Sequence, residues 1–306
     1  MEIRQMRYFL KIAELGSFSR ASQALHIAQP ALSHQIAQLE GELGHALLHR
    51  RHNGVQVTEQ GQAFYSQAQR ILKQIDDVPN VVNRSAAQLR GTVTVGLPQS
   101  TASQYAMPLM EALRERHAGV GLELFDEISG NLMRGIHSGR MDIAVIVSDD
   151  DALLANATAL MDEELFLVTS AGNDVGPKIP VASLATMPLA LPGIGHGVRA
   201  LVESAVRVHG AVLPTPAIVA NSMSIMRRAV ESGAVCSVMP WAAICDEIRA
   251  GTMRAVPLEP RLSRRVHVCW SKDSGLSLAA QAVRDLLIEV ARARVRSGQW
   301  LGVELL

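Results

Sequence analysis

The stretch IAQPALSHQIAQLEGELG, residues 27–44, combines a proline near its start with a strong helical pattern. Proline is tolerated in the first turn of a helix, so Pro30 predicts the start of a helix rather than a break. Apolar residues recur at helical spacing and are expected to face a core: Ala31, Leu32, Ile36 and Leu39. Polar side chains project from the other sides: Gln29, Ser33, His34 and Gln38.

The segments on either side of this helix predict a small helical unit with a two-stranded wing. Upstream, an apolar stripe is formed by Met6, Phe9, Leu10 and Ala13. Ser19 is a candidate cap for a second helix. Downstream, HRRHNGVQVT (residues 49–58) contains Asn53-Gly54, a strong hairpin turn signal.

A unit of this shape fits the major groove of DNA, which admits one helix. Gln pairs with adenine, Ser bonds a base or a phosphate, and His reaches a guanine acceptor or a backbone oxygen. Polar residues on one helix face are more often simply solvated, but Arg50 and Arg51 add positive charge beside this face. The pattern therefore favours a DNA-reading helix, with these candidates: Gln29, Ser33, His34, Gln38, Arg50 and Arg51.

The composition excludes several classes of protein. The 306 residues carry a formal net charge of zero, so affinity for nucleic acid has to come from a local patch. The sequence contains no secretory signal and no run of about 18 apolar residues, which predicts a cytoplasmic protein without a membrane segment. Its three cysteines, Cys236, Cys245 and Cys269, are typical of buried thiols rather than of disulfides or a metal site.

Motifs for catalysis or cofactor binding are weak. GIGHG (residues 193–197) is not the dinucleotide fingerprint, and no acidic ribose partner follows it. His45, His49 and His52 would share one face only if a single helix ran through them, so contacts of the wing with phosphates are the better interpretation. We find no Ser-His-Asp set and no paired carboxylates. We therefore expect no catalytic residues, no metal and no cofactor, and a protein that is not an enzyme.

A long amphipathic segment connects this unit to the rest of the chain. It runs from Thr58 to about Gln88, and its apolar seam needs a cover that a second copy of the chain would provide. Pro79 is expected to end or kink this helix near Val78, because proline removes a backbone donor and clashes with the preceding turn.

After residue 90, short β-branched runs alternate with helical stretches, which implies parallel sheets built from βαβ units. Strand-like runs near 164–170 and 264–271 bracket a middle block of about a hundred residues. We therefore predict two α/β subdomains, with the chain crossing twice between them. A final helix over residues 278–296 is expected to pack on the first subdomain.

Residues 16–61, GSFSRASQALHIAQPALSHQIAQLEGELGHALLHRRHNGVQVTEQG, resemble the winged helix-turn-helix of LysR-type transcriptional regulators. The resemblance extends over the whole chain: a linker helix follows, then an effector domain arranged like a periplasmic solute-binding protein. The implied ranges are 1–58 (winged helix-turn-helix), 59–89 (linker and dimerisation), and 90–306 (effector domain, with subdomains 90–161 plus 268–306 and 162–267). Within the family, MSIMRRAVESGAVCSVMP resembles the nitrogen-assimilation-control branch.

The resemblance carries DNA contacts over to five matching positions: Gln29, Pro30, Ser33, His34 and Arg51. His34 departs from the family pattern, which often has arginine there, and this weakens a bidentate contact with guanine. Pro79 departs from a linker helix that is usually continuous.

The resemblance also implies a small-molecule pocket between the subdomains. In such folds, strand ends and helix starts point backbone N–H groups into the crevice. The candidate effector-binding residues are Ser100, Thr101, Ser103, Ile128, Ser129, Pro192, Gly193, His196, Arg199, Asn221, Ser222 and Met223. Hydroxyls at helix starts also serve merely as caps, and Arg199 is as readily a solvated side chain as a partner for a carboxylate.

These features predict a LysR-like regulator that binds double-stranded promoter DNA and associates as a dimer or a tetramer. A small organic effector and RNA polymerase are its further expected partners. Two alternatives stay open: a two-lobed α/β enzyme or solute-binding protein with an accessory helical unit, and a redox switch that uses Cys236 and Cys269.

Overall fold

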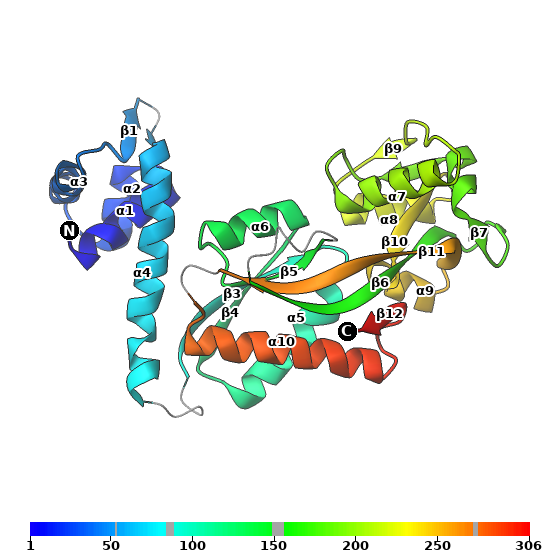
Figure 1. Ribbon diagram of the computed structural model, residues 1–306. Coiled ribbons are helices and arrows are strands. Elements are labelled where there is room, and N and C mark those ends of the chain that lie inside the picture. Colours follow the sequence, from blue (N-terminus) through cyan, green and yellow to red (C-terminus); the bar gives the residue numbers. More distant parts are fainter. Residues whose placement is uncertain (53, 84–88, 149–155, 272–274) are drawn as a thin grey trace.

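The computed structural model describes residues 1–52, 54–83, 89–148, 156–271 and 275–306. The N-terminal unit consists of α1 (Ile3–Leu15), α2 (Phe18–Leu25), α3 (Gln29–Leu43) and a hairpin of β1 (Leu48–Arg51) and β2 (Gly54–Val57). Long helix α4 (Glu59–Asn83) stands between this unit and the α/β domain (Figure 1). None of the helices described is long and apolar enough to cross a membrane.

The N-terminal unit has a core of its own, to which α4 contributes. Phe9 of α1 is fully buried and meets Phe64 of α4 edge to face, with 5.0 Å between the ring centroids. The cap of α2 is Ser17, whose Oγ accepts from the Arg20 amide, so the expectation that Ser19 caps this helix is wrong. Ser19 lies inside the first turn because the helix starts at Phe18.

Helix α4 passes through Pro79 and is described as far as Asn83, so Pro79 does not end it near Val78. The last part of the expected helix, residues 84–88, lies outside the described residues. Pro79 removes one backbone hydrogen bond of the helix. The side chain of the next residue, Asn80, attaches the helix to the backbone of Arg90. Asn80 accepts from the Arg90 amide at 2.9 Å and donates to the Arg90 carbonyl at 2.7 Å.

The first subdomain sandwiches parallel strands between helices. Strand β3 (Gly91–Pro98) pairs in parallel with β4 (Val120–Glu127) and β5 (Ile143–Val147). Helix α6 (Ser129–His137) covers one face; α5 (Ala102–Arg116) and α10 (Leu278–Arg296) cover the other (Figure 1). Alternation along β5 explains both cores, because Ile143 and Val145 face α5 and α10 whereas Ala144 and Ile146 face α6.

Two long strands cross between the subdomains, β6 (Ala157–Ser170) and β11 (Met253–Trp270). They pair with each other in antiparallel fashion, as do β5 with β11 and β10 (Cys236–Pro240) with β6. The sheet is therefore mixed, and the prediction of purely parallel sheets is wrong where the chain crosses. A strand that enters the second subdomain and another that returns have to run in opposite directions. Strand β12 (Val303–Leu305) also pairs with β6.

The second subdomain repeats the layered arrangement. Strands β8 (Leu189–Leu191), β9 (Ile218–Val219) and β10 are parallel. Helix α7 (Gly197–Val208) packs in one hydrophobic cluster and α8 (Met223–Glu231) in another, on opposite faces. The remaining short elements are β7 (Ile179–Pro180), η3 (Val181–Thr186), η4 (Trp241–Ala243) and α9 (Cys245–Arg249).

Candidate functional site

The polar face of α3 is open to solvent. Gln29, Pro30, His34 and Gln38 are exposed, and Ser33 is half-buried. The apolar side of the same helix is buried at Leu32, Ile36 and Leu39. Ala31, which was also expected to face the core, is exposed. Since α3 carries no acidic residue in its first turn, the positive end of its dipole is not neutralised by its own carboxylates. This end of the unit therefore favours an anionic partner.

Strand β1 places two arginines beside α3. Arg51 is exposed and makes no hydrogen bond or ion pair within the described part of the chain. Arg50 is also exposed, but its Nη2 donates to Ser33 Oγ at 2.6 Å, and its guanidinium carbon lies 4.3 Å from the Phe18 ring centroid. All seven predicted DNA-contact residues are thus accessible, and one of the arginines is already engaged by the helix.

A cavity of about 890 Å³ lies between the two α/β subdomains. Small-molecule sites commonly have volumes of roughly 300–1,000 Å³. Helix starts from both subdomains border it, those of α6, α7 and α8. Seven of the predicted effector residues line the cavity: Ser100, Ile128, Ser129, Pro192, His196, Asn221 and Met223.

The other five predicted effector residues do not line this cavity: Thr101, Ser103, Gly193, Arg199 and Ser222. Arg199 pairs with Glu203 one turn along α7, at 2.7 Å. Ser222 caps α8 through its hydroxyl, which accepts from the Ile225 amide. Capping is thus its role in this structure, as it often is for serine before a helix.

Arg264 of β11 is a lining residue that the sequence interpretation missed. It is 5% exposed, and its Nη2 lies 2.7 Å from Oε2 of fully buried Glu163 on β6. The same Nη2 donates to Ser100 Oγ at 2.7 Å, whereas Nη1 makes no hydrogen bond within the described residues. The sequence did offer a signal, since Arg264 lies in a strand-like run. Arginine is rarely buried without a partner, so an arginine in such a run indicates a buried ion pair or a binding site.

The cavity combines an apolar wall with positive charge. Among the described residues, Glu127 is the one carboxylate that lines the cavity, and it pairs with Arg140 at 2.7 Å. Burial and, secondarily, the charge of Arg264 lower the pKa of His196 from its ordinary value. The cationic lining groups are Arg134 and Arg264, and the apolar ones include Ile128, Met133, Ile146, Val147, Val198, Leu201, Met223, Met226, Val238 and Met239.

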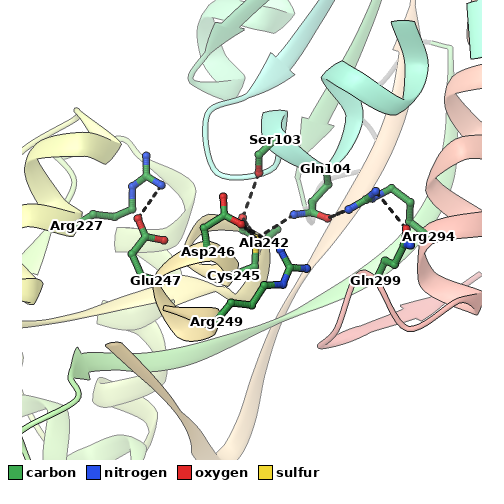
Figure 2. Close-up of polar contacts among 10 residues, drawn as sticks. All are labelled: Ser103, Gln104, Arg227, Ala242, Cys245, Asp246, Glu247, Arg249, Arg294 and Gln299. Atoms are coloured by element: carbon green, nitrogen blue, oxygen red, sulfur yellow. Dashed lines mark hydrogen bonds and ion pairs between the residues drawn. The ribbon is translucent and has the colours of Figure 1, made fainter. Parts of the chain in front are cut away.

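A group of polar contacts outside the cavity lining joins α5 and α10 of the first subdomain to η4 and α9 (Figure 2). Gln104 of α5 is buried, and its Nε2 donates to Cys245 Sγ at 3.2 Å. Its Oε1 accepts from Arg294 Nη2 at 2.9 Å. Ser103 Oγ, which does not reach the cavity, donates instead to the Ala242 carbonyl. Residues 98–100 and 238–240 both line the cavity, and the hydrogen bond from Ser103 to Ala242 joins the residues that follow these two segments in the chain.

The cysteines do not form a redox pair. Cys236 and Cys269 are both buried and belong to different hydrophobic clusters. Burial raises the pKa of the Cys269 thiol to about 12, so its reactive thiolate form is scarce. This geometry argues against the redox switch. His49 lies on strand β1, so His45, His49 and His52 do not share a helical face.

The two parts of the chain match two families of known sequences. Residues 3–62 match the family described as bacterial regulatory helix-turn-helix protein, lysR family. Residues 86–292 match the LysR substrate binding domain, which covers more than half of the chain.

Individual proteins resemble the chain over nearly its whole length. The nitrogen assimilation regulatory protein nac of Escherichia coli is 32% identical over 305 residues, covering 98% of this chain and 99% of that protein. The protein of the same name from Klebsiella aerogenes is 32% identical over 297 residues, or 95% of each. A full-length OxyR variant from Pseudomonas aeruginosa has the same fold, with a TM-score of 0.75, 24% identity and 95% of each chain covered.

Proposed function

The chain belongs to the LysR family of bacterial transcriptional regulators, and we propose that it adjusts its binding to promoter DNA according to a small molecule held between its subdomains. Members of this family combine a DNA-binding helix-turn-helix with an effector-binding domain. The observation that carries the proposal is the cavity of about 890 Å³ with walls from both subdomains. A ligand that contacts both walls favours one relative arrangement of the two.

The proposal divides the work among three parts of the chain. DNA binding is assigned to residues 1–58, the connection and dimerisation to 59–89, and effector binding to 90–306. The effector part divides into 90–161 with 268–306 and into 162–267. We assign the chain no enzymatic activity and place its action in the cytoplasm, with promoter DNA and RNA polymerase as partners.

For DNA recognition, we propose that α3 enters the major groove. Gln29, Ser33, His34 and Gln38 then face base edges, and Pro30 lies at the end of α3 that approaches the backbone. Arg51 supplies a phosphate contact, since its side chain is exposed and not engaged elsewhere in the described residues. Two copies would read half-sites about one helical turn apart, roughly 10 base pairs.

The effector that fits best is an organic anion with an apolar body. Arg264 is buried at the cavity edge, and its Nη1, which makes no hydrogen bond within the described residues, can donate to a carboxylate. The one carboxylate that lines the cavity among the described residues, Glu127, is already paired with Arg140, and the rest of the described wall is largely aliphatic or methionine. A cationic ligand would bring its charge close to Arg134 and Arg264, and the described lining residues offer it no free carboxylate.

Movement of the first subdomain can reach the DNA-binding unit through α4. Lys73 of α4 pairs with Asp142 at 2.8 Å, and Asp77 Oδ2 accepts from the Leu278 amide at the start of α10, at 3.2 Å. These contacts, together with those of Asn80 to the Arg90 backbone, fasten helix α4 to the subdomain. A rotation of that subdomain would change the separation of two recognition helices in an oligomer without changing any base contact.

Exposed apolar side chains support self-association. Val78, Val81 and Val82 project from α4, and Met107 and Met110 from α5. Such side chains are covered in many obligate assemblies. We propose that copies of the chain associate through α4 and the effector domain, as a dimer or a tetramer.

The test uses the full-length protein with three probes of matched size: phenylacetate, phenylacetamide and phenethylammonium. We expect only the anion to raise the thermal unfolding midpoint and to change the footprint on a selected promoter fragment. At about 100 times its Kd, a ligand stabilises the folded state by roughly 2.7 kcal/mol. Stabilisation by the cation alone would contradict the proposed chemistry, and turnover of a probe would favour the enzyme alternative.

A further inference from the structure

Arg50 lies in the wing but makes its side-chain contacts with the helices. Its Nη2 donates to Ser33 Oγ on α3 at 2.6 Å, and its guanidinium lies over the ring of Phe18, the first residue of α2. A cation over an aromatic face is attracted by the electrons of the ring. The stacking and the hydrogen bond together hold the planar group in one orientation.

The backbone of the wing fixes the place from which Arg50 reaches across. Arg50 is the register partner of Val55 in the hairpin, and the Val55 amide donates to the Gly16 carbonyl at 2.9 Å, in the turn between α1 and α2. The strand therefore cannot slide relative to the helices without breaking this bond. A Cβ at Gly54 would lie only 2.8 Å from the Gly16 oxygen, so the approach needs glycine there.

The contact with Arg50 leaves the Ser33 hydroxyl with its proton. A serine hydroxyl carries one donor and two acceptor positions, and Arg50 occupies an acceptor position. Serines within helices often donate to the carbonyl four residues earlier, as Ser66 does to the Gln62 carbonyl at 3.2 Å. Ser33 makes no such bond in the described chain, so its O–H is free to donate to a ligand.

We propose that Arg50 is a positioning residue that turns Ser33 into a hydrogen-bond donor for one base. The partners that accept such a bond in the major groove are purine N7, guanine O6 and thymine O4. Cytosine presents its N4 amino group there, which is a donor and can use only the one acceptor position that Arg50 leaves on Ser33 Oγ, so cytosine is the weaker partner. The inference rests on the proposed entry of α3 into the major groove. It assigns Arg50 to base discrimination rather than to the phosphate backbone.

The neighbouring Arg51 provides a matched control. Both arginines lie on β1 and both are exposed, but Arg51 contacts neither Ser33 nor an aromatic ring. A phosphate contact weakens binding to every sequence when it is lost and lowers the slope of log affinity against log salt by about 0.9. Loss of a positioning residue instead changes the preference at a single base pair.

The experiment is a double-mutant cycle in the full-length protein. Ser33→Ala, Arg50→Ala, the double variant, Arg51→Ala and Arg50→Lys are compared on a selected duplex and on versions with each base at every half-site position. We expect Ser33→Ala and Arg50→Ala to flatten the preference at the same position, each with roughly a fivefold or greater loss of discrimination against cytosine. The double variant should lose no more than either single variant.

Two further results separate the mechanisms. Arg50→Lys keeps a donor and the charge, so it should restore part of the preference if Arg50 acts through Ser33. Arg51→Ala should weaken all duplexes alike and lower the salt dependence. A uniform loss for Arg50→Ala, additive with Ser33→Ala and with a lower salt slope, would overturn the inference. A wild-type protein that binds all duplexes equally would instead refute the assignment of α3 as the reading helix.

Discussion

The polar face of α3 and the cavity between the subdomains differ in how their chemistry is assembled. On α3, the proposed reading residues belong to one helix whose orientation is set by Leu32, Ile36 and Leu39, and all of their side chains but that of Ser33 are exposed. The cavity brings together segments from residue 98 to residue 264, and its most buried charged group, Arg264, depends on Glu163 about a hundred residues away. Substitutions at α3 should therefore alter recognition, whereas those around the cavity should alter stability first.

The largest expected effect is at the buried ion pair. Glu163→Leu keeps a side chain of similar size but leaves the Arg264 charge buried without its partner. We expect the free energy of unfolding to fall by about 3–5 kcal/mol. The control is Asp162→Leu, which breaks the more exposed pair with Arg265 and should cost less than about 1 kcal/mol. Equal losses in denaturant titrations would show that burial does not distinguish the two pairs.

A smaller loss of stability is expected at Gln104, which joins α5 to α9 and α10. Gln104→Leu removes, at a buried position, both the acceptor for Arg294 Nη2 and the Nε2 donor to Cys245 Sγ. This should cost about 1–3 kcal/mol. Gln299→Leu is the matched control, because Gln299 also accepts from Arg294 but is exposed. If Gln299→Leu loses as much stability as Gln104→Leu, the burial of Gln104 does not explain its contribution to stability.

At α3 the comparison predicts the opposite behaviour. Gln29→Ala should leave the unfolding free energy unchanged and reduce discrimination at one base pair by about 1–3 kcal/mol. Arg51→Ala should weaken binding to all duplexes and flatten its salt dependence. Both are measured by titration of specific and scrambled duplexes at two salt concentrations. A uniform loss for both variants would remove the distinction between reading and anchoring.

The smallest effect concerns pH. Burial and the charge of Arg264 lower the pKa of His196 below its ordinary value of 6.5, and its Nδ1 accepts from the Val198 amide only while neutral. Below about pH 6.5 the unfolded chain takes up a proton that the folded protein resists, so stability falls as pH drops toward the lowered folded pKa. His196→Asn keeps a capping side chain and should lose less stability between pH 7.5 and 5.5. Identical pH slopes would contradict this.

The sequence was most informative where structure is local. The helical spacing of Leu32, Ile36 and Leu39 determines which residues of α3 are exposed, and the helix over 278–296 follows from its own periodicity. The expected end of the linker helix near Val78 was wrong, and the kink at Pro79 stays a prediction; the anchoring of Asn80 to Arg90 depends on a contact ten residues away. The mixed sheet was missed because strand direction is not encoded in a β-branched run.

For the cavity, the sequence identified helix starts but not which of their groups face inward. Ser100 lines the cavity whereas Thr101 is completely buried beside it, a difference of one residue that depends on how α5 packs. Arg264 reaches the cavity only because β6 and β11 pair with Arg264 opposite Glu163. Such a register between distant strands cannot be derived from either strand alone.

The central claim is that two copies of α3 read bases in successive major grooves. Its most direct test is the selection of duplexes from a random library by the full-length protein at moderate salt, followed by sequencing. The account predicts enrichment of two related half-sites whose centres are separated by about one helical turn, roughly 10 base pairs. Retained duplexes without any shared sequence would contradict it.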